Sequence, residues 1–199
     1  MFRELAARPV GIVDYLLAAA QGSGNVLALY RTESAGARSS VEEILWRSFA
    51  FGAVVGVVSL FLMAVIYGRL GARAGGKSTT SQVIHVLAYG GVPLVAGVAL
   101  WVLTALIVGE PAFISTPRAG AEPFLVLLLR VQFAVYVLLL LWSILLQVMG
   151  LSEIQGLALR KAFGVWILGQ LVGYLLSVFL AMLIDALFPG VLLHFIPPH

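Results

Sequence analysis

The chain contains no cysteine, and this absence excludes both a disulfide framework and a metal site built from thiolates. It is also poor in charge, because Asp, Glu, Lys and Arg together make up only 11% of its 199 residues. A soluble domain of ordinary composition carries about 25% charged residues. We therefore expect most of the surface of this chain to face lipid rather than water.

Basic residues outnumber acidic residues only slightly, 12 to 9, for a formal net charge of +3. They are scattered along the chain, and no basic stripe alternates with aromatic side chains. A nucleic-acid partner is therefore not expected. A small excess of this kind is typical of loops that are retained on the cytoplasmic side of a membrane.

Metal-binding and nucleophilic residues also lack a useful pattern. The histidines are His85, His194 and His199, and the last two are separated by Pro197 and Pro198, so they cannot share a helix face. No ligand spacing typical of a metal site occurs, and no Ser, His and acid grouping indicates a nucleophile. We predict that the chain is not an enzyme and carries no cofactor, and that His85 is an interfacial or hydrogen-bonded residue.

Hydrophobic residues make up 61% of the chain, and most of them lie in four long runs. Each run can cross a hydrocarbon core of about 30 Å as a helix, and a helix is the structure that satisfies its own backbone in lipid. The predicted fold class is therefore all-α, a polytopic transmembrane bundle of about four spans within residues 48–185. The four spans are expected near residues 48–67, 83–108, 124–149 and 162–184.

The two ends of the chain are harder to interpret. Residues 1–47 are predicted to be an N-terminal interfacial or amphipathic segment, with one or two short helices lying on the membrane or folded against the bundle. A fifth span within residues 10–30 is the open alternative. The sequence Ser40-Val41-Glu42-Glu43 predicts a capping box that starts a long helix near Val41. Residues 186–199 form an apolar tail that is too short to cross.

Small residues recur every four positions in the first and fourth runs, which predicts that these helices pack closely with each other or with the third helix. The third run instead carries polar side chains on one face, which should point inward because amides in hydrocarbon need partners. The small residues are Ser48, Gly52, Gly56, Ala64 and Gly68, then Gly169, Gly173, Ser177 and Ala181, and the polar ones are Gln132, Tyr136, Ser143 and Gln147.

Two interpretations of the intramembrane polar residues are open. In the first, they are structural hydrogen bonds between helices. In the second, Gln132, Gln147, Gln170 and Asp185 line a polar path or pocket, as in a small-solute or ion transporter or channel. Asp185 lies near the end of the fourth run, so an interfacial position is favoured over a role in proton transfer.

Residues 71–78 read Gly-Ala-Arg-Ala-Gly-Gly-Lys-Ser and fit the pattern of a phosphate-binding loop. Here the pattern follows a membrane helix instead of a buried strand, so a basic loop is the favoured interpretation. Arg69, Arg73 and Lys77 share a side of a four-span chain with Arg160 and Lys161, which favours a cytoplasmic position for both loops. Three arginines before the first run argue for the reverse orientation: Arg31, Arg38 and Arg47.

Several short motifs resemble the family of Ypt-interacting proteins, the Yip family. They are Gly75-Gly76-Lys77-Ser78, Leu87-Ala88-Tyr89-Gly90-Gly91-Val92-Pro93, Trp142, Gly150-Leu151-Ser152-Glu153-Ile154-Gln155-Gly156-Leu157 and Arg160-Lys161-Ala162. The resemblance covers roughly residues 45–185. It implies a polytopic membrane protein, commonly with five spans, and eukaryotic members are linked to Rab-type GTPases and vesicle traffic. This chain departs from the family in having four clear spans and no long hydrophilic N-terminal domain.

The resemblance implies a candidate cytoplasmic contact surface at Glu153, Gly156, Arg160 and Lys161, to which the basic loop adds Lys77. The expected function is a non-enzymatic membrane scaffold or adaptor that binds a partner protein or lipid through its basic cytoplasmic loops. The alternative is the transporter or channel described above. Composition rich in Ala, Gly and Arg favours a bacterial member in the inner membrane, with a homo-oligomer among the possible assemblies.

Overall fold

The computed structural model describes residues 2–115 and 122–187, with the side chains of Arg3, Ala181, Ile184 and Asp185 excepted. All regular structure in these residues is helical. The helices are α1 (Phe2–Ala6), α2 (Ile12–Thr32), η1 (Ala35–Ala37), α3 (Val41–Arg73), α4 (Thr80–Gly90), α5 (Val92–Val108), η2 (Glu110–Phe113), α6 (Pro123–Gln155) and α7 (Leu159–Leu187).

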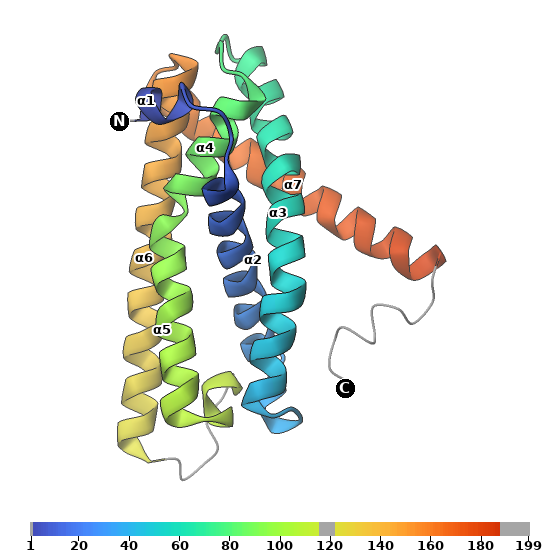
Figure 1. Cartoon of the computed structure of the whole chain (residues 1–199), viewed down its shortest axis with the longest axis vertical. Helices are drawn as coiled ribbons and strands as arrows, with labels where there is room; N and C mark the ends of the chain where they lie inside the picture. Colours follow the sequence, from blue (N-terminus) through green and yellow to red (C-terminus); the bar gives the residue numbers. More distant parts are fainter. Residues whose placement is uncertain (1, 116–121, 188–199) are drawn as a thin grey trace.

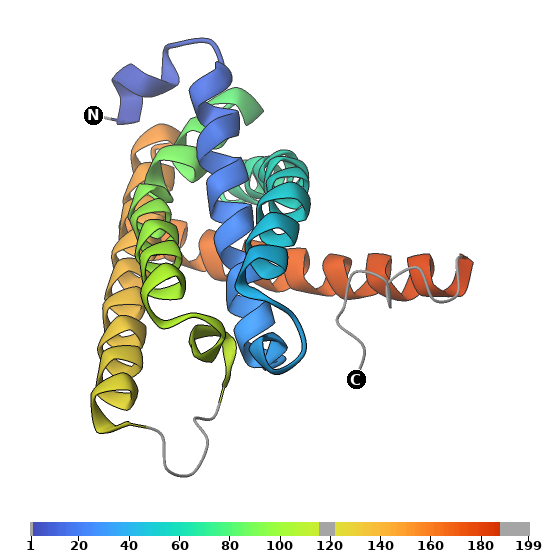
Figure 2. The same ribbon diagram turned by 60° about the horizontal axis from the view of Figure 1, so that its bottom comes forward.

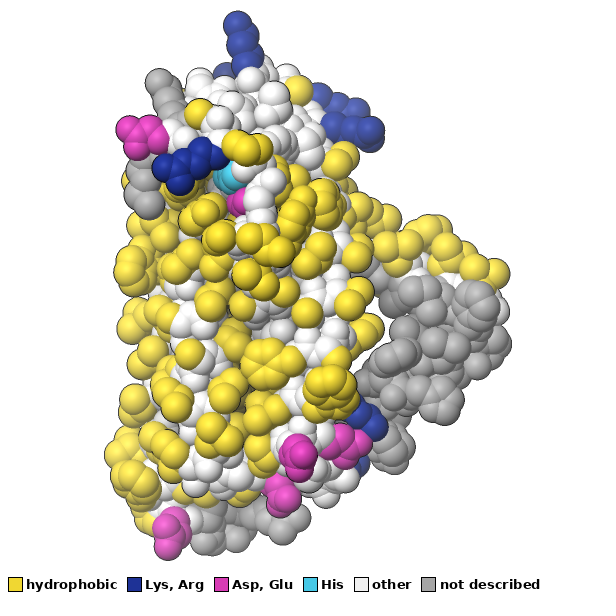
Figure 3. Space-filling view, in the orientation of Figure 1, with side chains coloured by type: hydrophobic (Ala, Val, Ile, Leu, Met, Phe, Trp, Pro, Cys, Tyr) yellow, Lys and Arg dark blue, Asp and Glu magenta, His cyan; other side chains and the backbone are white. Residues whose placement is uncertain are grey.

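Five of the described segments are long and apolar enough to cross a membrane: α2, α3, the α4–α5 pair, α6 and α7. The all-α, polytopic prediction is confirmed, and the open fifth span corresponds to α2. Helices α2, α3, α5 and α6 run side by side along the long axis, whereas α7 leaves the bundle obliquely (Figure 1 and Figure 2). Apolar side chains cover most of the visible flank of the bundle, as a lipid-facing surface requires (Figure 3).

The start of α3 follows from its capping residues. The Ser40 hydroxyl accepts a hydrogen bond from the Glu43 amide at 3.3 Å, which is one of the two bonds of the predicted capping box, and the reciprocal bond from the Glu43 side chain is not formed. The Glu43 carboxylate pairs with Arg47 one turn later, at 2.6 Å. Helix α3 is 33 residues long in all, or about 50 Å at 1.5 Å per residue. It is therefore longer than the hydrocarbon core is thick, and its ends reach both interfaces.

Residues 12–32 form one helix of 21 residues that is folded along α3, where one or two short helices were expected. The contact between α2 and α3 is made backbone to backbone. A Cβ atom added to Gly22 would collide with the backbone of Gly52 and Gly56, and one added to Gly56 would collide with the carbonyl group of Ala18. Only glycine at these positions allows the two helices to approach so closely.

This contact corrects the prediction for the small residues of α3. Gly52 and Gly56 pack against α2, which did not count among the clear spans of the sequence, and Gly68 has only Thr80 of α4 close to it. The small residues of α7 do pack on α3, but they meet large side chains there. Gly169 lies against the ring of Tyr67, and Gly173 lies against the thioether of Met63.

The second predicted run is broken into α4 and α5 at Gly91, two residues before Pro93. Proline has no amide hydrogen, so a helix loses a backbone hydrogen bond here. Side chains from two other helices bind the carbonyl groups next to the break. The Gln21 amide on α2 donates to the Ala88 oxygen at 2.9 Å, and the Ser143 hydroxyl on α6 donates to the Gly90 oxygen at 2.9 Å. These bonds allow an interrupted helix at membrane depth.

Charge is distributed unequally between the two ends of the bundle. In Figure 3 most of the visible Lys and Arg side chains lie at the end where α3 finishes, and most of the acidic ones lie at the opposite end. We call the first of these the basic end. Its exposed basic residues are Arg8, Arg69, Arg73, Lys77, Arg160 and Lys161. The N-terminal helix α1 lies at the same end (Figure 1).

Candidate functional site

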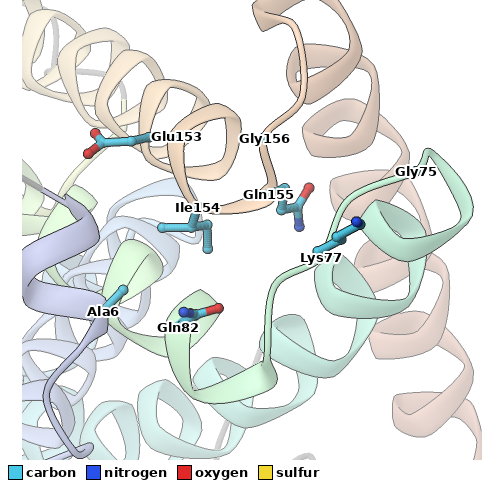
Figure 4. Close-up of a pocket in the computed structure, with 8 residues that line it drawn as sticks. All are labelled: Ala6, Gly75, Lys77, Gln82, Glu153, Ile154, Gln155 and Gly156. Carbon is cyan, nitrogen blue, oxygen red and sulfur yellow. The ribbon is translucent and has the colours of Figure 1, made fainter.

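The basic end holds a pocket with a volume of about 490 Å³. It lies between the end of α6, the loop that follows α3, and the first turns of α4, with α1 at its edge (Figure 4). We call it the basic-end pocket. Its lining residues are Ala6, Gly75, Lys77, Gln82, Glu153, Ile154, Gln155 and Gly156. Segments that are far apart in the sequence therefore meet at one site.

Gln155 holds the two loop segments together. Its side-chain amide donates to the Tyr67 carbonyl oxygen on α3 at 3.2 Å. The main-chain carbonyl oxygen of Gln155 accepts a hydrogen bond from the Lys77 main-chain amide at 3.3 Å. Gly71 and Gly76 leave the space that it occupies, since a Cβ atom on either would collide with the Gln155 side chain. The space that the buried Gln155 side chain needs therefore explains Gly71 and Gly76.

The same contacts bear on the phosphate-binding pattern of residues 71–78. A phosphate cradle needs backbone amides that point freely at the anion. In this loop the Gly75, Gly76 and Lys77 amides already donate to the carbonyl oxygens of Ala72, Gly71 and Gln155. These amides form a closed turn, which favours the interpretation as a basic loop.

Gly156 ends α6 in the left-handed conformation, with φ +66°, where glycine avoids the strain of a side chain. Beyond it, the Leu157 amide donates to the Ser152 carbonyl oxygen, and the Ser152 hydroxyl donates to the Leu157 carbonyl oxygen at 2.7 Å. This closed turn sets the direction in which α7 begins at Leu159.

The structure brings part of the predicted contact surface together. Lys77, Glu153 and Gly156 line the basic-end pocket. Arg160 and Lys161 lie outside it, exposed in the first turn of α7 at the same end of the bundle. The predicted surface is thus a pocket with two neighbouring cations, all positioned by the α6–α7 turn.

A second, larger cavity of about 670 Å³ lies within the bundle. We call it the intramembrane cavity. Helices α2, α3 and α7 contribute most of its wall, and α4, α5 and α6 contribute the rest. No Asp, Glu, Lys or Arg among the described residues lines it. The polar lining residues are Gln21, Asn25, Ser59, Tyr67, Ser143, Gln147, Trp166, Gln170, Tyr174 and Ser177.

One side of the intramembrane cavity carries a chain of hydrogen bonds that ends at the helix break. The Trp166 indole on α7 donates to the Gln147 side-chain oxygen at 3.1 Å. Gln147 in turn donates to the Ser143 hydroxyl at 3.3 Å, and Ser143 donates to the Gly90 carbonyl oxygen. The inward position predicted for the polar face of α6 is confirmed at Ser143, which is buried, and Gln147, which is half-buried.

The predicted polar path of four residues is only partly assembled. Gln147 and Gln170 both line the intramembrane cavity. Gln132 does not line it, because 15 residues of α6 separate it from Gln147, about 22 Å along the helix. Gln132 is buried, and neither of its side-chain polar atoms has a hydrogen-bond partner among the described residues. The side chain of Asp185 lies outside the described residues.

A buried acid–histidine pair joins α2 to α4, and no sequence pattern predicted it. Asp14 and His85 are 2% and 3% exposed, and Asp14 Oδ1 lies 2.7 Å from His85 Nδ1. Asp14 Oδ2 accepts from the Gly11 amide at 2.9 Å. His85 Nε2 lies 3.0 Å from the Arg8 carbonyl oxygen. The expectation that His85 is hydrogen-bonded is confirmed, but 71 residues separate it from a partner that the sequence could not identify.

Among residues 2–115 and 122–187, no group of three or more His, Cys, Asp and Glu side chains could hold a metal ion. No family model, curated protein sequence or solved structure matches the chain.

Proposed function

We propose that this integral membrane protein is a non-enzymatic scaffold or adaptor whose basic end binds an acidic surface of a partner protein. The observation that carries the proposal is the meeting of the 75–77 and 153–156 segments in one pocket at the basic end. Arg160 and Lys161 add exposed positive charge beside it. Loop residues on a rigid helical frame are where binding sites most often occur.

The orientation of the chain follows from the same charges. If α2 crosses the membrane, the N-terminal segment and both basic loops lie on one side, and the positive-inside rule assigns that side to the cytoplasm. Among the described residues the basic end carries six Lys and Arg side chains, whereas the opposite end carries four, Arg31, Arg38, Arg47 and Arg130. The larger count at the basic end outweighs the arginines that argued for the reverse orientation. We assign the chain to the bacterial inner membrane on its composition.

Membership in the Yip family is part of the proposal. Five candidate spans equal the number that the resemblance implies, and α2 supplies the span that the sequence left open. The residues of the resembling motifs have structural roles that a shared fold would explain. Pro93 follows the break between α4 and α5, and Gly156 forms the turn before α7.

Charge reversal at the basic end is expected to remove the partner. In the triple variant Lys77→Glu, Arg160→Glu and Lys161→Glu, crosslinking in native membranes followed by mass spectrometry should recover the partner about tenfold less well, because like charges across an interface repel. Arg130→Glu is the control for a charge reversal away from the basic end, since Arg130 is exposed on α6 near its opposite end. The control should leave recovery unchanged.

Two outcomes contradict the adaptor. One is a partner that both variants retain equally. The other is a crosslinked anionic lipid in place of any protein, with its yield lowered by the triple variant, which would make the basic end a membrane-surface contact.

A second candidate function, transport of a small solute, is favoured by the intramembrane cavity beside a broken helix. Interrupted spans supply such cavities in many transporters. If the cavity carries flux, Gln147→Leu and Gln170→Leu should each lower solute uptake into proteoliposomes severalfold. Gln132→Leu removes the same amide outside the cavity and should leave uptake unchanged. Equal uptake in all three variants would rule out a path along this cavity.

A further inference from the structure

Part of the intramembrane cavity consists of polar side chains that have no partner among the described residues. Asn25 on α2, Ser59 on α3, and Gln170 and Tyr174 on α7 all line it, and all four are exposed. None of them makes a hydrogen bond to another described residue. This contrasts with the lining residues next to the helix break: Gln21 and Ser143 donate to its carbonyl oxygens, and Gln147 donates to Ser143.

These four residues lie near the middle of helices that are long and apolar enough to span the membrane. At that depth lipid chains offer no hydrogen bonds, so an amide that faces them is costly. Asn25 and Gln170 each present a donor and an acceptor. Because these amides have no partner among the described residues, they favour an occupant of the cavity that can both donate and accept hydrogen bonds.

The rest of the wall restricts the chemistry of that occupant. The described lining contains no ionisable carboxylate, ammonium or guanidinium, so a charged group would lose its hydration without gaining a counter-charge. Most other lining residues are apolar, among them Leu60, Leu62, Met63, Leu140 and Ile144. A volume of about 670 Å³ lies within the range of small-molecule sites.

The cavity is also open at the flank of the bundle. Asn25, Ser59, Gln170 and Tyr174 in its lining are exposed rather than enclosed, and α7 diverges from α3 in both views of the fold (Figure 1 and Figure 2). The surrounding surface is apolar: Val58 and Leu175, which lie next to Ser59 and Tyr174 in sequence, are 60% and 58% exposed. An occupant can therefore enter sideways from the lipid.

We propose that the intramembrane cavity binds an uncharged membrane amphiphile of the diacylglycerol class. Its hydroxyl and ester groups bind Asn25 and Gln170, and its acyl chains lie along the apolar wall and extend into the bilayer. This site is separate from the basic-end pocket and does not depend on the adaptor function. It shares the cavity with the second candidate function but requires binding alone, without flux.

The test uses two photoactivatable lipids with the same diazirine-labelled acyl chains, a diacylglycerol and a phosphatidylglycerol. The full-length protein is reconstituted into phosphatidylcholine vesicles that contain one probe at a time, irradiated, and mapped by peptide mass spectrometry. We expect the diacylglycerol probe to label the cavity-lining stretches of α2, α3 and α7 in preference to the charged probe. Gln170→Leu should lower that labelling roughly three- to tenfold, the effect of one lost hydrogen bond in a membrane.

A matched pair of filling variants controls for general effects on the fold. Ser59→Phe places a ring in the cavity, whereas Val58→Phe places the same ring on the neighbouring exposed position outside the lining. Labelling should be lost in the first and retained in the second. Equal labelling by both probes, or labelling that survives Ser59→Phe, would overturn the proposal.

Discussion

Replacing Gly56 by alanine is expected to destabilise the bundle by about 1 to 3 kcal/mol or more, the usual cost of overpacking a close contact. The added methyl group would collide with the carbonyl group of Ala18 and crowd Gly22 on α2. Both of these are backbone atoms, so no side chain can move aside, and the two helices must separate. Unfolding by sodium dodecyl sulfate in mixed micelles, followed by tryptophan fluorescence, measures the effect.

Gly164→Ala provides the matched control, because Gly164 is also helical and no neighbouring atom lies within 4 Å of the position that its added methyl group would take. Both substitutions gain the same helix propensity, which stabilises by up to about 1 kcal/mol in an open position. The difference between the two variants therefore isolates the contact between α2 and α3. If the two variants have the same stability, α2 does not pack on α3 as described, and its role as a fifth span loses its main support.

The contrast between α2 and α3 explains what sequence patterns can predict in this fold. Helix α3 is recognisable because it combines a capping serine with an uninterrupted apolar run. Helix α2 contains Asp14, Gln21 and Asn25, so its hydropathy is the lowest of the five candidate spans. The tertiary structure explains why each of these polar residues is present, and the local sequence does not. Asp14 bonds to α4, Gln21 bonds to the helix break, and Asn25 faces the intramembrane cavity.

The candidate sites follow the same rule. Spacing along α6 correctly placed Ser143 and Gln147 on an inward face, because helical periodicity is local. Residue spacing could not predict that Gln132, on that same face, lies outside the cavity. The length of the cavity along α6 depends on how the other helices pack. The glycines of residues 71–78 fit a phosphate loop by spacing alone, and only the fold reveals that the distant Gln155 side chain fills the space beside Gly71 and Gly76.

The pair of Asp14 and His85 is expected to tolerate asparagine at position 14 but not loss of the histidine. His85 Nε2 faces the Arg8 carbonyl oxygen, which can only accept, so Nε2 must carry a hydrogen. The contact of 2.7 Å between Nδ1 and Asp14 Oδ1 then requires one more proton between them. That proton belongs either to an imidazolium beside a carboxylate or to a carboxylic acid beside a neutral imidazole. The pair has no net charge in either form.

In Asp14→Asn, the side-chain amide carries the hydrogen that must lie between position 14 and His85 Nδ1. The amide nitrogen can donate to Nδ1 of a neutral His85, and the amide oxygen can still accept from the Gly11 amide. We expect this variant to remain within about 1 kcal/mol of the native chain, since all of its hydrogen bonds can be kept. His85→Leu leaves the buried Asp14 Oδ1 and the Arg8 carbonyl oxygen without their partners. Breaking a buried pair in this way costs about 3 to 5 kcal/mol.

A double-mutant cycle with Asp14→Leu and His85→Leu completes the test by the same unfolding assay. The double variant should lose less free energy of unfolding than the two single variants lose together. Each single change leaves the partner side chain without its hydrogen bond, and the double change removes both side chains.

The pair also fixes the chain at Arg8 and Gly11, between α1 and α2, and Ala6 of α1 lines the basic-end pocket. Limited proteolysis of the His85→Leu variant should therefore cleave near residues 7–11 faster than in the native chain, while Asp14→Asn is cut at the native rate. Additive costs, or equal cleavage in all variants, would mean that the pair does not hold the N-terminal segment against the basic end.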